Sequence, residues 1–198
     1  MSIRPGKRHD VVPGVTLHGV FMRVHEIGVL LTGASGVGKS ELALELLARG
    51  HQLIADDTVD FSLRQRSVIG RAPRLLRGFL EARSLGILNI AALYGARSVA
   101  PRGKLELVLH LQTPRTDRDT GIERLSGRRG TTTILGATLP EITIPMRLGH
   151  NLAVLVETAC RDLQLRQQGY RADEDFIERQ SGEIRKQECR EPPRNEKP

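Results

Sequence analysis

Eight consecutive residues have the types and spacing of a phosphate-binding loop. They are Gly33, Ala34, Ser35, Gly36, Val37, Gly38, Lys39 and Ser40, a full match to G-x-x-x-x-G-K-[ST]. The glycines let the backbone curl so that its N–H groups point at phosphate oxygens. Lys39 can supply a positive charge to the β- and γ-phosphates, and the Ser40 hydroxyl can ligate Mg²⁺. The motif predicts a site for a nucleoside triphosphate.

Phosphoryl transfer also needs a group that positions or deprotonates the acceptor, and usually a carboxylate that helps to hold the metal. Asp56 and Asp57 end the next apolar stretch. Because adjacent residues on a strand point to opposite faces, we expect at most one of them to face the loop. Either one of the pair accepts a hydroxyl proton or both cap a turn, and the pattern favours neither interpretation. By residue type alone, Glu81, His18 and Arg124 do not stand out from ordinary surface or packed side chains.

The elements that position this loop follow from the apolar pattern. We predict strands over residues 15–24, 28–32, 53–55, 59–63, 105–111 and 142–144, and helices over residues 41–48, 152–163 and 172–185, with short helical stretches around Leu80 and Ile90. His25 and Glu26 are expected to form a turn that makes the first two strands a hairpin. Because strands alternate with helices and several strands are joined by short turns, we predict an α/β fold of the P-loop kinase type, with a mixed sheet flanked by helices.

Length and composition limit the class of protein. The chain has 198 residues, which fits one domain, and we divide it into a flexible lead-in (1–13), a catalytic domain (14–187) and a disordered charged tail (188–198). The net charge is +7, but aromatic residues make up only 3% of the chain, and this scarcity argues against base-stacking surfaces that bind single-stranded nucleic acid. Neither a disulfide framework, a signal peptide nor an apolar run long enough to span a bilayer is present in the sequence. We therefore expect a cytoplasmic protein that binds neither nucleic acid nor membranes.

Beyond the P-loop, residues 14–180 resemble the C-terminal catalytic domain of bacterial HPr kinase/phosphorylase, whose fold is similar to that of phosphoenolpyruvate carboxykinase. The resemblance rests on His18-Gly19-Val20 before the loop, Ala55-Asp56-Asp57 after it, the segment around Glu81, Glu123-Arg124-Leu125, and Asn151-Leu152-Ala153-Val154. The P-loop alone is shared by many families, and its combination with these segments is much more specific.

The resemblance implies an enzyme that uses ATP and Mg²⁺ to phosphorylate a serine of HPr, a phosphocarrier of the sugar phosphotransferase system. The family also removes that phosphate with inorganic phosphate as the attacking group. The resemblance implies catalytic roles for His18, Lys39, Asp57 and Arg124, nucleotide binding by residues 33–40, and metal ligation by Ser40 and Glu81. It also implies assembly into a homo-hexamer.

Three positions depart from the family pattern, namely Ala34, Ser84 and His150, where acidic, glycine and arginine residues are usual. Because the last two lie in segments linked to chemistry, we expect kinase activity to exceed phosphorolysis. Many members also carry an N-terminal domain, whereas a short lead-in precedes the catalytic part here. The alternative hypothesis is a nucleotide-binding regulatory module with weakened catalysis. A nucleic-acid-binding protein, suggested by the net charge, is the third and least favoured hypothesis.

Overall fold

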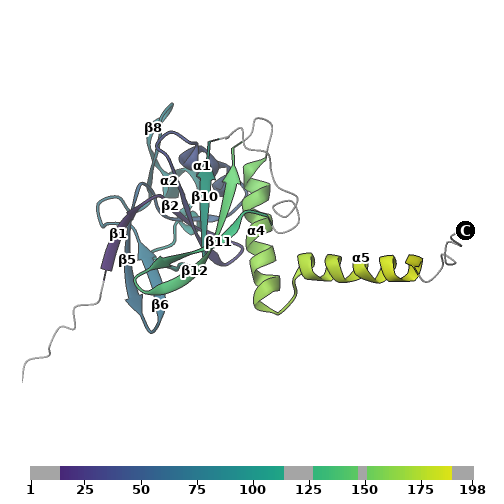
Figure 1. Ribbon diagram of the computed structural model, residues 1–198. Helices are drawn as coiled ribbons and strands as arrows, with labels where there is room; N and C mark the ends of the chain where they lie inside the picture. Colours follow the sequence, from purple (N-terminus) through teal and green to yellow (C-terminus); the bar gives the residue numbers. More distant parts are fainter. Residues whose placement is uncertain (1–13, 114–126, 147–150, 189–198) are drawn as a thin grey trace, which may run out of the picture.

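The computed structural model describes residues 14–113, 127–146 and 151–188 and is built around a six-stranded mixed sheet (Figure 1). Its strands, in spatial order, are β11 (Arg129–Ile134), β12 (Ala137–Pro145), β10 (Leu107–Gln112), β3 (Ile27–Gly33), β2 (Val20–Val24) and β4 (Gln52–Ala55). The central strands β12, β10 and β3 run parallel, and the other neighbours pair antiparallel. The predicted mixed sheet is confirmed.

A second, antiparallel sheet covers one face of the first. It consists of β1 (Gly14–His18), β5 (Thr58–Arg64), β6 (Ser67–Arg71) and β9 (Gly103–Lys104). Phe21 and Leu30 of the central sheet pack here against Phe61 and Val68. The rings of Phe21 and Phe61 meet edge to face with 5.4 Å between their centroids.

Helices α1 (Lys39–Ala48) and α4 (Leu152–Gln167) cover the opposite face of the central sheet. Met22 and Leu31, which alternate in direction with Phe21 and Leu30, are buried there with Leu46 and Val156 of the helices. Strands β2 and β3 are therefore buried on both faces, which explains why they are apolar at nearly every position.

Smaller elements complete the domain. They are the hairpin of β7 (Phe79–Ala82) and β8 (Gly86–Asn89), the short helices α2 (Ile90–Tyr94) and η1 (Ala96–Ser98), and the C-terminal helix α5 (Ala172–Glu188). Helix α5 projects away from the domain (Figure 1). At its start, Arg166 joins Asp162 of α4 to Asp173 of α5 with donor–acceptor distances of 2.8 and 2.9 Å. Across the part of the chain that the structure describes, every helix is too short or too polar to cross a lipid bilayer.

Two predictions from the sequence were wrong. The stretch around Leu80 and Glu81 is strand β7 rather than a helix, and residues 15–24 form two strands that belong to different sheets. The break falls at Gly19, where an added Cβ would lie 2.6 Å from the carbonyl oxygen of Leu31. The predicted turn at His25, the short helix at Ile90 and the helices over 41–48, 152–163 and 172–185 are confirmed. The predicted lead-in and tail lie outside the described residues, apart from position 188.

Candidate active site

The predicted P-loop connects the end of β3 to the start of α1. Gly33, Gly36 and Gly38 have φ angles of 137°, 78° and 99°, a region that side chains with a Cβ rarely adopt. A Cβ on Gly36 would also lie 2.7 Å from Nη1 of Arg83. The first turn of α1 follows directly, and the N–H groups of a first helical turn have no partners within the helix. The loop therefore has the backbone of an anion-binding site.

Two cationic side chains border this loop. The Lys39 ammonium donates to the carbonyl oxygens of Gly33 and Ala34, both at 3.0 Å. The Arg83 guanidinium donates to the hydroxyl oxygen of Ser35 at 3.1 Å, which joins the β7–β8 hairpin to the loop. Two positive charges thus lie where a polyphosphate would bring negative charge.

A cavity of about 190 Å³ opens beside the loop and contains most of the predicted site. Its lining combines the loop with carboxylates from two other segments: Val20, Ser35, Gly36, Gly38, Lys39, Ser40, Glu41, Asp56, Asp57, Glu81 and Arg83. The structure thus brings Lys39, Ser40, Asp57 and Glu81 together, although they are separated in sequence. Val37, in contrast, packs into the hydrophobic core.

Asp56 and Asp57 both line the cavity, which corrects the expectation that only one of them faces the loop. Strand alternation does not apply, because β4 ends at Ala55 and Asp57 has a left-handed φ of 60°. Asp56 is buried, and its Oδ2 accepts a hydrogen bond from the backbone N–H of Glu81 at 2.8 Å. Burial raises the pKa of Asp56 above its ordinary value. Backbone hydrogen bonds from Glu81 and Asp57 oppose this shift, and the negative charges of the same two residues add to it.

Asp57 is exposed and lies beside His18, the predicted histidine at the end of β1. Its Oδ1 is 3.7 Å from Nδ1 of His18, and the two side chains are 74% and 84% exposed. The backbone also holds this corner, since the Asp57 carbonyl accepts from the N–H of Gly19 at 3.0 Å. An accessible carboxylate next to an imidazole suits proton exchange with an incoming hydroxyl group.

The oxygen donors of the cavity fit Mg²⁺. Ser40, Asp56, Asp57 and Glu81 supply one hydroxyl and three carboxyl groups, and hard cations such as Mg²⁺ prefer oxygen ligands. The predicted metal ligands Ser40 and Glu81 are part of this set.

Sequence reasoning did not single out Arg83, and the predicted Arg124 lies outside the described residues, as does His150. Arg83 lies in the turn after β7, which ends at Ala82, and its contact with Ser35 brings together residues 48 positions apart. Periodicity along one segment carries no signal for such a contact. The fold and the cavity together define a P-loop protein of the mixed-sheet α/β type with a carboxylate-rich site beside the loop.

Comparison with known proteins places this architecture in a family. The family model described as HPr Serine kinase C-terminal domain matches residues 10–180, and the chain belongs to this family. The HPr kinase/phosphorylase of Chromobacterium violaceum is 45% identical over 173 residues, covering 87% of this chain and 54% of that protein. The HPr kinase/phosphorylase of Azoarcus sp. is 47% identical over 168 residues, covering 84% and 53%. The chain thus spans about half the length of these curated relatives.

A solved structure agrees with this assignment. The Hpr(Ser) kinase/phosphatase from Coxiella burnetii superposes with a TM-score of 0.74 and 33% sequence identity, covering 82% of this chain and 98% of that one. The resemblance inferred from the sequence is confirmed.

Proposed function

We propose that the chain is an ATP- and Mg²⁺-dependent protein serine kinase that phosphorylates HPr or a related phosphocarrier in the cytoplasm. One observation carries the proposal: a single cavity joins the P-loop lysine to the exposed carboxylate of Asp57 and to Glu81. Family membership supports the same activity, and the relatives' names supply HPr as the substrate.

Lys39 and Arg83 bind the phosphates of ATP. Lys39 exchanges the carbonyl oxygens of Gly33 and Ala34 for oxygens of the β- and γ-phosphates, and the loop N–H groups supply further hydrogen bonds. Arg83, already hydrogen-bonded to Ser35, places a second positive charge at the rim of the cavity. These groups offset the charge that spreads over the γ-phosphoryl oxygens during transfer.

Asp57 acts as the base. The serine oxygen of the phosphocarrier attacks the γ-phosphorus, the bond from that phosphorus to the bridging oxygen of ADP breaks, and the serine proton passes to the Asp57 carboxylate. His18, 3.7 Å away, orients this carboxylate. When bound to Ser40 and Glu81, Mg²⁺ supplies charge neutralisation between the phosphates.

The same groups support the reverse use of the site. With inorganic phosphate as the nucleophile, the phosphoserine bond breaks, pyrophosphate forms, and a protonated Asp57 returns its proton to the serine oxygen. Arg124 and His150, which the family resemblance connects with this direction, lie outside the described residues. Because His150 stands where the family usually has arginine, we propose that kinase activity exceeds phosphorolysis.

We propose that the chain assembles into a homo-hexamer, because the family to which it belongs does so by the resemblance described above. Light scattering coupled to size-exclusion chromatography measures it directly, and a monomeric mass would contradict it.

The decisive experiment measures transfer of labelled γ-phosphate from ATP to HPr from the same cell. We expect label on one serine, dependent on Mg²⁺, with none on a Ser→Ala variant of HPr. The reverse reaction is assayed with phosphoserine-HPr and inorganic phosphate. Nucleotide binding without transfer in either direction would reject the enzyme and favour the regulatory module.

A further inference from the structure

A second group of polar side chains gathers at the end of the domain opposite the P-loop. His25 lies in the turn between β2 and β3, His51 lies between α1 and β4, and Glu157 lies on α4. Each offers one ligand atom, and these atoms all lie within 4.8 Å of one another. Residues from three separate elements thus converge on one point.

Two of these residues are already in contact. Nε2 of His51 lies 2.8 Å from Oε1 of Glu157, and His51 is only 8% exposed. The rings of His25 and His51 meet at nearly a right angle with centroids 4.9 Å apart. Nε2 of His25 is buried and has no hydrogen-bond partner among the described residues. A buried nitrogen without a partner costs free energy, so this atom calls for a ligand.

The surrounding structure fixes the donors. His25 and Glu26 occupy the left-handed region with φ of 45° and 66°, and Gln164 of α4 donates to the carbonyl oxygen of His25 at 2.9 Å. Arg49 donates to Oε2 of Glu157 at 3.3 Å, which leaves Oε1 facing His51. Such supporting hydrogen bonds are what orient metal ligands in proteins.

The His25 ring is suited to coordination because its neutral form is favoured. Burial lowers the pKa of His25 below its ordinary value, and the nearby His51 and Arg161 act in the same direction. Glu157 opposes them, since its negative charge favours the protonated ring. A neutral imidazole presents the lone pair that a metal needs.

We propose that His25, His51 and Glu157 form a zinc site that nothing in the phosphoryl-transfer function requires. Two imidazole nitrogens and one carboxylate are a ligand set that zinc accepts, with water in the fourth tetrahedral position. Tetrahedral zinc places its ligand atoms about 3.3 Å apart, given bond lengths of about 2.0–2.1 Å. Donor atoms now within 4.8 Å reach that spacing through small side-chain movements.

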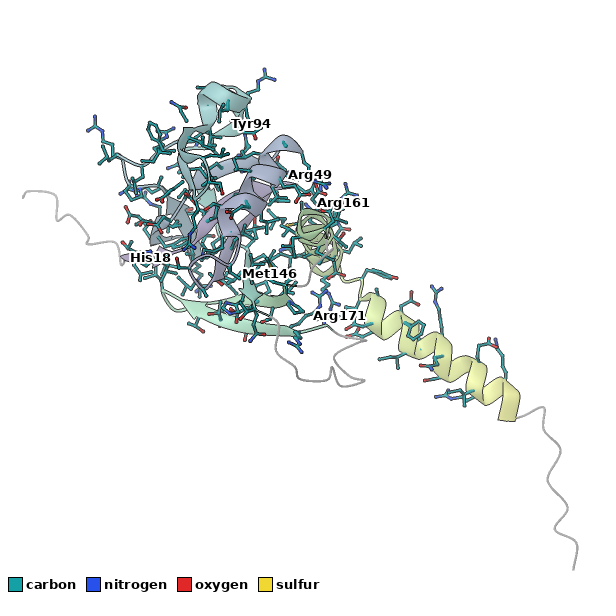
Figure 2. All side chains as sticks on the ribbon, turned by 90° about the horizontal axis from the view of Figure 1, so that it is seen from above. His18, Arg49, Tyr94, Met146, Arg161 and Arg171 are labelled. Atoms are coloured by element: carbon teal, nitrogen blue, oxygen red, sulfur yellow. The ribbon has the colours of Figure 1, made fainter. Side chains whose placement is uncertain are left out.

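The position of the site indicates a structural role. Helix α1 has 10 residues, so its two ends lie about 15 Å apart, with the P-loop at one end and His51 beyond the other. Zinc here would join the β2–β3 turn, the α1–β4 connection and α4. Two arginines lie near this site, Arg49 and Arg161, and Figure 2 labels them on the side where the end of α1 meets α4. Their positive charge lowers the affinity of the site for the zinc cation.

The test is zinc titration of the untagged full chain in competition with a chromophoric chelator. We expect saturable binding of one equivalent, together with a tetrahedral visible spectrum when Co²⁺ replaces zinc. His25→Asn removes the imidazole that has no partner, and asparagine tolerates the left-handed turn, so folding is preserved. This variant should bind zinc about tenfold more weakly or worse. At the same zinc concentration, the melting temperature should rise in the wild type and rise less in His25→Asn.

His110→Asn is the matched control, since it removes a histidine that lies outside the cluster, on β10 beside Thr32. It should bind zinc as the wild type does. The proposal is overturned by the absence of saturable binding, by wild-type affinity in His25→Asn, or by equal losses in both variants, which would show non-specific binding to histidines.

Discussion

The carboxylate of Asp56 accepts a hydrogen bond from the backbone N–H of Glu81, with 2.8 Å between Oδ2 and N. The bond joins the end of β4 to β7, which belong to different sheets. Since Asp56 is buried, this contact fixes the backbone that carries Glu81 into the cavity. The two adjacent aspartates therefore differ in role, with Asp56 positioning a neighbouring segment and Asp57 exposed beside His18.

Two substitutions of Asp56 should distinguish the contribution of its hydrogen bond to stability from the contribution of its charge. Asp56→Asn keeps an oxygen acceptor for the Glu81 N–H and removes a buried charge, so stability should change by less than about 1 kcal/mol. Asp56→Ala leaves that N–H without a partner and should cost about 1–3 kcal/mol. Urea denaturation of both variants checks this, and equal losses would show that the hydrogen bond does not hold the segment.

Asp57→Asn should lower the rate of serine phosphorylation severely while leaving ATP binding intact. Loss of a general base typically lowers the rate by about 10²–10⁴-fold. The phosphate-binding groups on the loop are untouched, so the affinity for ATP should stay near that of the wild type. Single-turnover transfer and equilibrium nucleotide binding measure the two quantities. Asp60→Asn, on the neighbouring strand, is the control and should keep wild-type activity.

Lys39→Ala should weaken triphosphate binding and remove catalysis without unfolding the protein. The Lys39 ammonium contacts two loop carbonyls, and removing a group that stabilises transition-state charge costs about 10²–10³-fold in rate. The melting temperature should change little, because the side chain is only partly buried. Unchanged turnover would contradict the proposed role of the loop.

Gly36→Ala should disturb the loop in two ways, through its φ of 78° and through the approach of the new methyl group to Arg83. We expect weaker nucleotide binding. In an Arg83→Ala background the steric part disappears and the backbone part remains, so the penalty of Gly36→Ala should be smaller there. A double-mutant cycle on nucleotide affinity measures the difference. Equal penalties in both backgrounds would show that the contact with Arg83 is unimportant.

The junction of α4 and α5 should weaken in acid. Partial burial alone would raise the pKa of Asp173, but backbone hydrogen bonds and Arg166 outweigh it and hold its pKa below the ordinary 3.8. A carboxylate with a lowered folded-state pKa contributes stability above pH 3.8 and loses it as the pH falls through the folded value. Hydrogen exchange at the start of α5 should therefore differ between wild type and Asp173→Asn at about pH 6 and converge near about pH 2. A constant difference across this range would contradict the role of the ion pair.

Local patterns in the sequence predicted the parts of the site that depend on neighbouring residues. The P-loop, the helix after it and the apolar strand before Asp56 are all defined within a few residues. The resemblance then added His18 and Glu81. Glu81 lines the same cavity as Asp57, and His18 lies beside the Asp57 carboxylate.

The features that sequence reasoning missed depend on distant contacts. Residues 15–24 have the composition of one continuous strand, and the division at Gly19 arises because β1 pairs with β5 while β2 pairs with β3. The left-handed φ of Asp57 likewise accompanies a distant contact, since the Asp57 carbonyl oxygen accepts a hydrogen bond from the N–H of Gly19. Alternation along one segment cannot show which partner strand it will meet.

The pairing of β3 has a consequence for how the chain folds during synthesis. On one side β3 meets β2 through a two-residue turn, but on the other Leu30 pairs with Val108, 78 positions later (108 − 30). Until β10 leaves the ribosome, the β2–β3 hairpin has an unpaired edge and apolar residues on both faces, a state prone to aggregation. Closing so long a loop is slow, and Gly33 gains its neighbour Leu111 only at that step. The P-loop is encoded early in the chain, yet its supporting strand is completed late.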